Sequence, residues 1–138
     1  MVTVPNYKSD KLYPGVVRAF DALLTRGKVV APVDVFLEMG NLDKSKYEDW
    51  RFGRVSSLES VIEGNLSKCC RILKIIGFHA HDLDMVPSRT AYKKWGKGRK
   101  LDLKFSKSGN GKIEAKYATS FVWNKKNSHP DWKESQES

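Results

Sequence analysis

The residues best suited to bind a ligand are basic side chains interleaved with aromatic rings between Tyr92 and Lys100. Lysine and arginine can hold phosphate groups, tyrosine and tryptophan can stack on bases, and Gly96 and Gly98 would let a backbone approach closely. The spacing is not that of a Walker phosphate-binding loop. The alternative is a turn whose tryptophan covers the core and whose lysines are solvated. We expect phosphate contacts from Lys93, Lys94, Lys97, Arg99 and Lys100, with Tyr92 and Trp95 as stacking rings.

The charge of the chain is concentrated in its C-terminal third. The net charge is +9, and the stretch from Val86 to Lys126 holds 12 Lys or Arg against Asp102 and Glu114, a net charge of +10. Clustered positive charge favours a polyanionic partner and binding that weakens steeply with salt. The alternative is a solubilising surface.

Catalytic patterns are absent from the local sequence. No Ser, Cys or His stands in an arrangement typical of an activated nucleophile. Paired carboxylates occur at Glu48-Asp49 and at Asp82-x-Asp84, but their spacing gives no specific support for a metal-dependent nuclease. We expect a non-enzymatic protein without a cofactor, and a nuclease-like site assembled in space stays an open alternative.

Histidines and cysteines do not form a metal-binding pattern. His79 and His81 would diverge on a helix, and Cys69 and Cys70 have the spacing of core residues. We therefore expect no metal site. Adjacent cysteines do not readily bridge and fit a reducing compartment. Because the sequence shows neither a secretory signal pattern nor an apolar run long enough to span a bilayer, we expect a cytoplasmic protein without a membrane partner.

Three helices are predicted in the first half of the chain. The first spans Tyr13 to Arg26, the second begins near Pro32 and ends before Gly40, and the third spans Lys44 to Arg51 with Asp43 as N-cap. Two short helices joined by a few residues that include a glycine are the outline of a helix-turn-helix, whose second helix can enter the major groove of DNA. The alternative is that the helix pair is only part of a helical core.

A longer helix is predicted from Ser57 to Ile76. The sequence Ser56-Ser-Leu-Glu59 has the form of a capping box, and apolar residues then recur at helical spacing. A kink or break is expected at Gly64-Asn65 because these residues interrupt good helix formers.

The C-terminal third is predicted to contain a short helix capped by Ser88 and then a β-hairpin. Apolar residues alternate from Leu101 to Phe105 and again from Ile113 to Phe121, on either side of a glycine-rich turn. In a winged helix such a tip lies along a phosphate strand or the minor groove. The expected tip contacts are Lys107, Asn110 and Lys112.

The segment Trp50-Arg51-Phe52-Gly53-Arg54-Val55 resembles the end of the readout helix in phage repressors of the Cro type. In that family a Trp and an Arg close the helix and Gly-Arg begins the exit loop. The resemblance implies that Arg51 and Arg54 reach a phosphate or a guanine edge. It also places Lys44, Ser45 and Lys46 at the groove. It departs from the family inside the preceding helix, where the bulky Phe36 or Leu37 stands in place of a small residue.

The span from about Tyr13 to Trp123 also resembles a small bacterial domain family without an assigned function. We therefore predict an α+β fold, mainly helical and helix-turn-helix-like, with a C-terminal hairpin that makes it winged-helix-like. A single domain is expected over 1–123 and a flexible polar tail over 124–138.

The predicted function is that of a small bacterial or phage regulator or accessory factor that binds double-stranded DNA. An RNA- or ribosome-associated binder is a first alternative. A protein-interaction module, such as an inhibitor or antitoxin-like partner, is a second. Readout of a palindromic site generally requires a homodimer, and no heptad marks a dimer helix.

Overall fold

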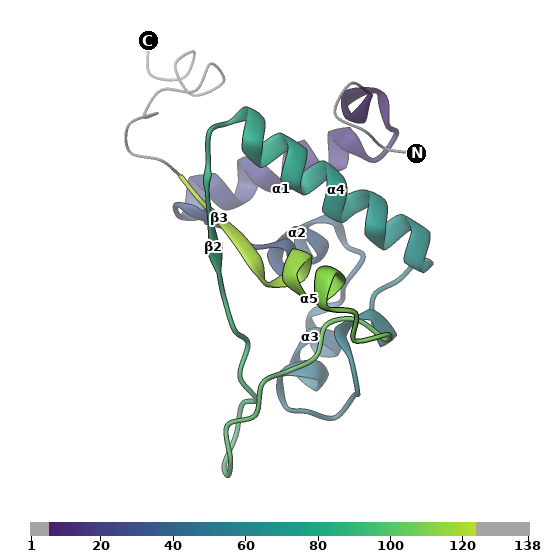
Figure 1. The fold of residues 1–138 in the computed structure, drawn as a ribbon, viewed down its shortest axis with the longest axis vertical. Coiled ribbons are helices and arrows are strands. Elements are labelled where there is room, and N and C mark those ends of the chain that lie inside the picture. The colour runs from purple at the N-terminus through teal and green to yellow at the C-terminus, as the bar shows by residue number, and fades with distance from the viewer. Residues whose placement is uncertain (1–5, 124–138) are drawn as a thin grey trace.

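A computed structural model describes residues 6–123, and in this range the chain is α+β, as predicted. A small antiparallel sheet lies at one side of the helices, and a narrow arm projects from one end of the molecule (Figure 1). No helix in this range is long and apolar enough to cross a membrane. The tail predicted over 124–138 lies outside the described residues. The elements in chain order are η1 (Tyr7–Ser9), α1 (Tyr13–Arg26), β1 (Val29–Val30), α2 (Pro32–Met39), α3 (Lys44–Arg51), η2 (Leu58–Ser60), α4 (Leu66–Asp82), β2 (Val86–Arg89), α5 (Gly111–Ala118) and β3 (Thr119–Val122).

The predictions for α1, α2 and α3 are confirmed to the residue at most boundaries. Proline occupies the first turn of α1 and of α2, where its missing N–H costs no helical hydrogen bond. Gly40 ends α2 with a φ of 81°, in the left-handed region that glycine adopts readily. Asp43 is the N-cap of α3, but its carboxylate accepts a hydrogen bond from Ser45 Oγ instead of from the backbone.

The prediction of one long helix from Ser57 to Ile76 is wrong at both ends. Leu58–Ser60 forms only the turn η2, and the long helix α4 spans Leu66–Asp82. The break comes at Gly64-Asn65, where Asn65 caps α4 by accepting a hydrogen bond from the N–H of Lys68 at 2.8 Å. The predicted capping box does not form because the Glu59 carboxylate is buried in contacts with distant residues.

The predicted hairpin is also wrong. The helix expected to begin at Ser88 is instead the strand β2, and most of the strand expected from Ile113 to Phe121 is the helix α5. Leu101–Phe105 joins no sheet and contributes only an isolated bridge to the arm. Asn110 directs this outcome, because its side chain accepts hydrogen bonds from the N–H groups of Lys112 and Ile113 and so caps a helix.

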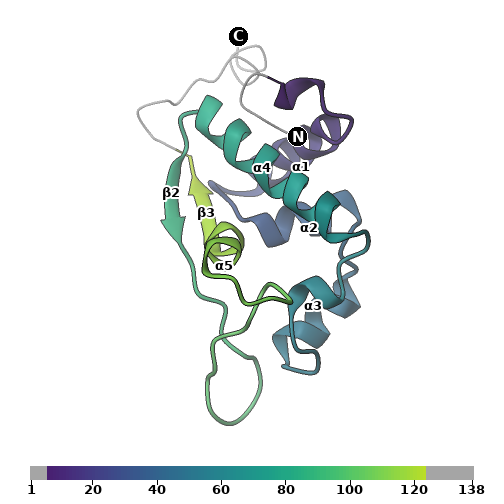
Figure 2. The ribbon, with the colours of Figure 1, turned by 45° about the vertical axis from the view of Figure 1, so that its right-hand side comes forward.

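The sheet has the strand order β1-β3-β2, with antiparallel pairing throughout. Val122 of β3 lies between Val29 of β1 and Val86 of β2. The helices α1 and α4 pack together beside α2, and both figures show α5 between this group and the projecting arm (Figures 1 and 2). The core is built from buried aromatic and branched side chains, of which the largest fully buried are Trp50, Tyr117, Phe20 and Phe36.

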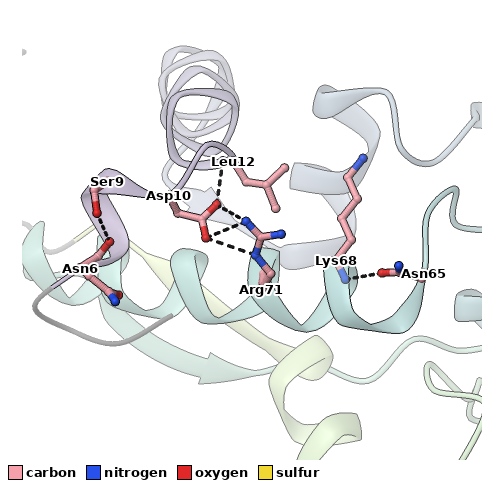
Figure 3. Close-up of polar contacts among 7 residues, drawn as sticks. All are labelled: Asn6, Ser9, Asp10, Leu12, Asn65, Lys68 and Arg71. Atoms are coloured by element: carbon pink, nitrogen blue, oxygen red, sulfur yellow. Dashed lines mark hydrogen bonds and ion pairs between the residues drawn. The ribbon is translucent and has the colours of Figure 1, made fainter. Parts of the chain in front are cut away.

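The N-terminal turn η1 is tied to α4 by a two-pronged ion pair (Figure 3). The guanidinium of Arg71 donates to both carboxylate oxygens of Asp10, with Nη2 to Oδ1 at 2.8 Å. Burial alone would raise the pKa of Asp10, but hydrogen bonds from the N–H of Leu12 and from Arg71 outweigh it and lower that pKa. Asp10 is therefore a charged and fully engaged carboxylate at neutral pH.

Candidate nucleic-acid interface

Residues 92–104 form the projection seen in Figures 1 and 2, which we term the basic arm. Its two sides are joined by backbone hydrogen bonds from Lys94 N to Leu101 O and from Leu103 N to Tyr92 O, both at 2.8 Å. The hairpin therefore turns at 95–100. The sequence-based prediction placed the hairpin tip about ten residues too late, at 106–112.

The root of the basic arm is fixed to α3 and η2 by hydrogen bonds. The indole N–H of Trp50, a fully buried side chain, donates to the carbonyl of Lys104 at 2.8 Å. The N–H of Leu58 donates to the same carbonyl at 3.2 Å, and the N–H of Glu59 donates to the carbonyl of Phe105 at 2.9 Å. The arm therefore leaves the body in a defined direction.

Two glutamates hold the chain where the basic arm meets α5. Glu59 accepts hydrogen bonds from Lys107 N and from Tyr117 Oη, each at 2.8 Å. Glu114 accepts hydrogen bonds from the N–H groups of Phe105 and Ser106. Burial and the neighbouring Glu59 raise the pKa of Tyr117, so the phenol stays protonated and donates its hydrogen bond.

The cations at the turn of the arm are exposed and form no ion pair with another described residue. They are Lys97, Arg99 and Lys100, of which Lys100 donates only to the carbonyl of Gly96, at 3.1 Å. Lys93 pairs with Asp102 across the arm, and both side chains remain largely in solvent. The arm therefore presents most of its positive charge outward.

Arg51 lies inside a cluster of rings at the base of the basic arm. Its guanidinium carbon is 4.5 Å from the ring centroid of Trp95 and 5.0 Å from that of Tyr92. Its carbonyl accepts a hydrogen bond from Trp95 N at 2.7 Å, and its buried Nε has no hydrogen-bond partner among the described residues. In this geometry Arg51 fastens the arm to α3, whereas the sequence predicted that it would reach DNA.

The two rings predicted to stack on bases both contact other side chains, although Tyr92 is half-buried and Trp95 is 37% exposed. Tyr92 contacts Trp50 and Phe105, with each pair of ring centroids 5.5 Å apart. Trp95 makes edge contacts with Tyr47 at 5.8 Å and with Phe52 at 5.6 Å. Burial raises the pKa of Tyr92, with smaller contributions from Asp34 and Tyr47, and Arg51 partly opposes the increase. Both rings are therefore engaged by other side chains, and Trp95 also keeps an exposed part.

The remaining predicted contacts are divided between α3 and α5. Lys44, Ser45 and Lys46 are exposed at the start of α3. Arg54 pairs with Asp49, with 3.1 Å between Nη1 and Oδ1, and its guanidinium lies over the ring of Phe52. Of these α3 residues and Arg51, the contacts described above join only Arg51 to the arm. Lys107, Asn110 and Lys112 belong to the turn that begins α5.

The structure adds residues that sequence reasoning did not assign to this surface. Lys104 contributes a further cation to the arm, while Trp50, Glu59 and Glu114 hold its root. Lys104 could have been found from the charge run alone. The roles of Trp50, Glu59 and Glu114 depend on tertiary contacts, which the local sequence pattern does not predict.

No family model, no curated protein and no solved structure matches this chain. Within 6–123, no group of three or more His, Cys, Asp or Glu side chains is placed to hold a metal ion. The functional argument therefore depends on the geometry and charge of the basic arm.

Proposed function

We propose that this chain binds double-stranded DNA, with the basic arm along the phosphate backbone. The observation that carries the proposal is the exposed set of cations at the turn of the arm, above a root fixed by Trp50, Glu59 and Glu114. Fixing the root reduces the ordering cost of binding. Lysine and arginine that neutralise phosphates release counterions, which supplies most of the affinity of sequence-independent binding.

A duplex fits this surface better than a single strand. Proteins that bind single strands combine a basic groove with aromatic rings on which bases stack. Tyr92 and Trp95 are already in contact with Arg51 and with other rings, and of the two only Trp95 is classed as exposed, at 37%. A backbone-tracking contact requires only the cations, which remain accessible.

The helix α3 has a smaller role in the proposal than the sequence suggested. Lys44, Ser45 and Lys46 can contact a phosphate strand from the start of α3. Arg51 and Arg54 have partners within the protein, and Arg54 shares its surface with the carboxylate of Asp49. We therefore propose phosphate positioning with little base readout. In a winged-helix-like arrangement, the basic arm between β2 and β3 would be the wing.

The test is fluorescence anisotropy with random duplex DNA, single-stranded DNA and hairpin RNA over a series of salt concentrations. The arm variant carries Lys97→Gln, Arg99→Gln and Lys100→Gln. Its control carries Lys28→Gln, Lys74→Gln and Lys116→Gln, which change the net charge equally outside the arm. We expect the arm variant to bind duplex DNA at least tenfold more weakly and to lower the salt slope by about 2 to 3, whereas the control stays near wild type.

Each alternative function predicts a different result. Preference for hairpin RNA over duplex DNA would favour an RNA-associated role. Equal losses in the arm variant and its control would show that net charge alone attracts nucleic acid. Absence of binding at low salt would overturn the proposal and favour a protein partner.

A further inference from the structure

A second basic surface lies on the body of the protein, where α1 begins and α2 ends. It is a hollow of about 470 Å³, within the size range of small-molecule sites. We term it the α1–α2 hollow. The residues that carry the argument are Lys11, Gly15, Arg18, Asn41 and Lys68.

The cations of the α1–α2 hollow have no carboxylate partner among the described residues. Lys11 and Arg18 are exposed, and Lys68 is half-buried. In Figure 3 the Lys68 side chain extends from the same side of α4 as the Arg71 guanidinium, and this side faces Leu12. Lys11 also helps to lower the pKa of the adjacent Asp10, but none of the three cations forms an ion pair with a described residue, and together they favour an anion.

The nearby carboxylates are already neutralised by other arginines. Asp10 precedes Lys11 and accepts both prongs of Arg71. Glu38 lines the hollow and is paired with Arg26. The positive charge of the hollow is therefore not cancelled by the acidic residues beside it.

Asn41 contributes an independent polar group to the hollow. The residue is only 9% exposed and lines the hollow, yet its side-chain amide forms no hydrogen bond with another described residue. Its backbone is fully engaged, with the N–H donating to Phe36 O at 3.1 Å and the carbonyl accepting from Glu63 N at 2.7 Å. The amide N and O atoms are not among the fully buried polar atoms that lack a partner, so they are accessible from the hollow and can bond to an anion that enters it.

The first turn of α1 contributes a further donor. Gly15 lines the hollow, and its N–H forms no hydrogen bond with another described residue. The Cβ position that a larger residue would occupy there lies 3.2 Å from Met39 Cε and 3.8 Å from Arg18 Nη2. A side chain at Gly15 would therefore crowd the Met39 methyl group, and the Gly15 N–H lies near the Arg18 head group at the helix end where anions are favoured.

We propose that the α1–α2 hollow binds a phosphate group. Arg18 and Lys68 supply charge, and the amide of Asn41 and the N–H of Gly15 donate hydrogen bonds to its oxygens. The phosphate could come from a free phosphorylated small molecule or from the backbone of a nucleic acid, which share this chemistry. The site does not depend on the basic arm, so it stands or falls separately from the proposed function.

Inorganic phosphate is the first probe, titrated at constant ionic strength against chloride and followed by the NMR signals of the Asn41 side-chain amide and the Gly15 N–H. We expect saturable shifts at millimolar phosphate. The double variant Arg18→Gln, Lys68→Gln should weaken binding at least tenfold, while the control Lys28→Gln, Lys74→Gln leaves it unchanged. Shifts no larger than those caused by chloride, or equal binding in the double variant, would overturn the proposal.

A second variant separates loss of binding from loss of folding. Asn41→Asp keeps the shape of the side chain but places a negative charge in the hollow, so it should abolish the phosphate response while thermal melting stays within a few degrees of wild type. An unaltered phosphate response in folded Asn41→Asp would overturn the site.

Duplex DNA added to the arm-neutralised variant and to wild type then identifies the source of the phosphate. Movement of the Gly15 and Asn41 signals with DNA in wild type would assign a nucleic-acid phosphate. Movement with inorganic phosphate alone would assign a small phosphorylated ligand. Either result supports the hollow, and loss of DNA binding in the arm variant with an intact phosphate response would still separate the two sites.

Discussion

The helix α3 and the basic arm carry similar kinds of side chain but use them differently. On α3 and its exit loop, Arg51 packs between rings and Arg54 pairs with Asp49. At the turn of the arm, Lys97 and Arg99 form no ion pair with another described residue. A cation whose interactions are satisfied inside the protein must give them up before it contacts a phosphate. The availability of a charge therefore identifies a binding surface better than its type or spacing does.

The largest effect is expected from removing the ring that α3 buries beneath the arm. Trp50→Ala deletes a fully buried side chain and the hydrogen bond to Lys104 O, and should lower the free energy of unfolding by about 3 to 5 kcal/mol. Urea denaturation followed by circular dichroism measures this loss. A loss below about 1 kcal/mol would contradict the view that α3 is first a structural helix.

Variants of Arg51 test whether this residue holds the arm in place or contacts DNA. Arg51→Ala removes the guanidinium that lies over Tyr92 and Trp95 and should loosen the arm, which trypsin would report as cleavage at the arm's lysines at least several-fold faster than in wild type. Duplex affinity should fall about threefold to tenfold, because a mobile arm must be ordered on binding. Arg51→Lys retains the charge but loses the planar stacking group, so it should resemble alanine in proteolysis.

The two Arg51 variants would behave differently if Arg51 were a DNA contact. If Arg51 contacts DNA directly, Arg51→Ala will weaken binding without changing the rate of proteolysis, and Arg51→Lys will restore most of the affinity.

Lys44 and Lys46 test whether the start of α3 contributes to the interface. The variant Lys44→Gln, Lys46→Gln should weaken duplex binding only about twofold to fivefold and equally for all sequences, because contacts to phosphate carry no base information. Anisotropy with a panel of duplexes measures both quantities. If the loss of affinity instead depended on the duplex sequence, α3 would be contacting bases in the groove.

Arg54 should show the smallest effect. Because its guanidinium already pairs with Asp49 and lies over Phe52, we expect Arg54→Gln to change duplex affinity by less than twofold and stability by less than about 1 kcal/mol, the usual range for an exposed ion pair. A tenfold loss of affinity limited to certain sequences would instead support the Cro-type interpretation of this segment.

Sequence information was sufficient where local chemistry determines structure. The bounds of α1, α2 and α3 follow from proline in the first turn and from the residues that end or cap each helix, such as Gly40 and Asp43. These signals act within a few residues. They are therefore readable without knowledge of the tertiary structure.

The errors arose where distant contacts decide between local options. Glu59 could have closed a capping box, but it accepts hydrogen bonds from Lys107 and Tyr117, which are 48 and 58 residues away. The alternating pattern after Ile113 also places Ile113 and Tyr117 four residues apart, a helical spacing, and Asn110 selects that helix. The charge of the arm was predicted correctly, whereas the engagement of its rings by Arg51 required the fold.

The paired stem of the basic arm allows the loop at its turn to vary in length. Because Lys94 and Leu101 are joined by a backbone hydrogen bond, the residues between them form a loop whose ends are already held together. Doubling the length of such a flexible loop costs only about 0.6 kcal/mol in closure entropy. Insertions at 96–100 can therefore lengthen the reach of the protein without disturbing its core, which makes this turn the natural place to graft a longer segment or a label.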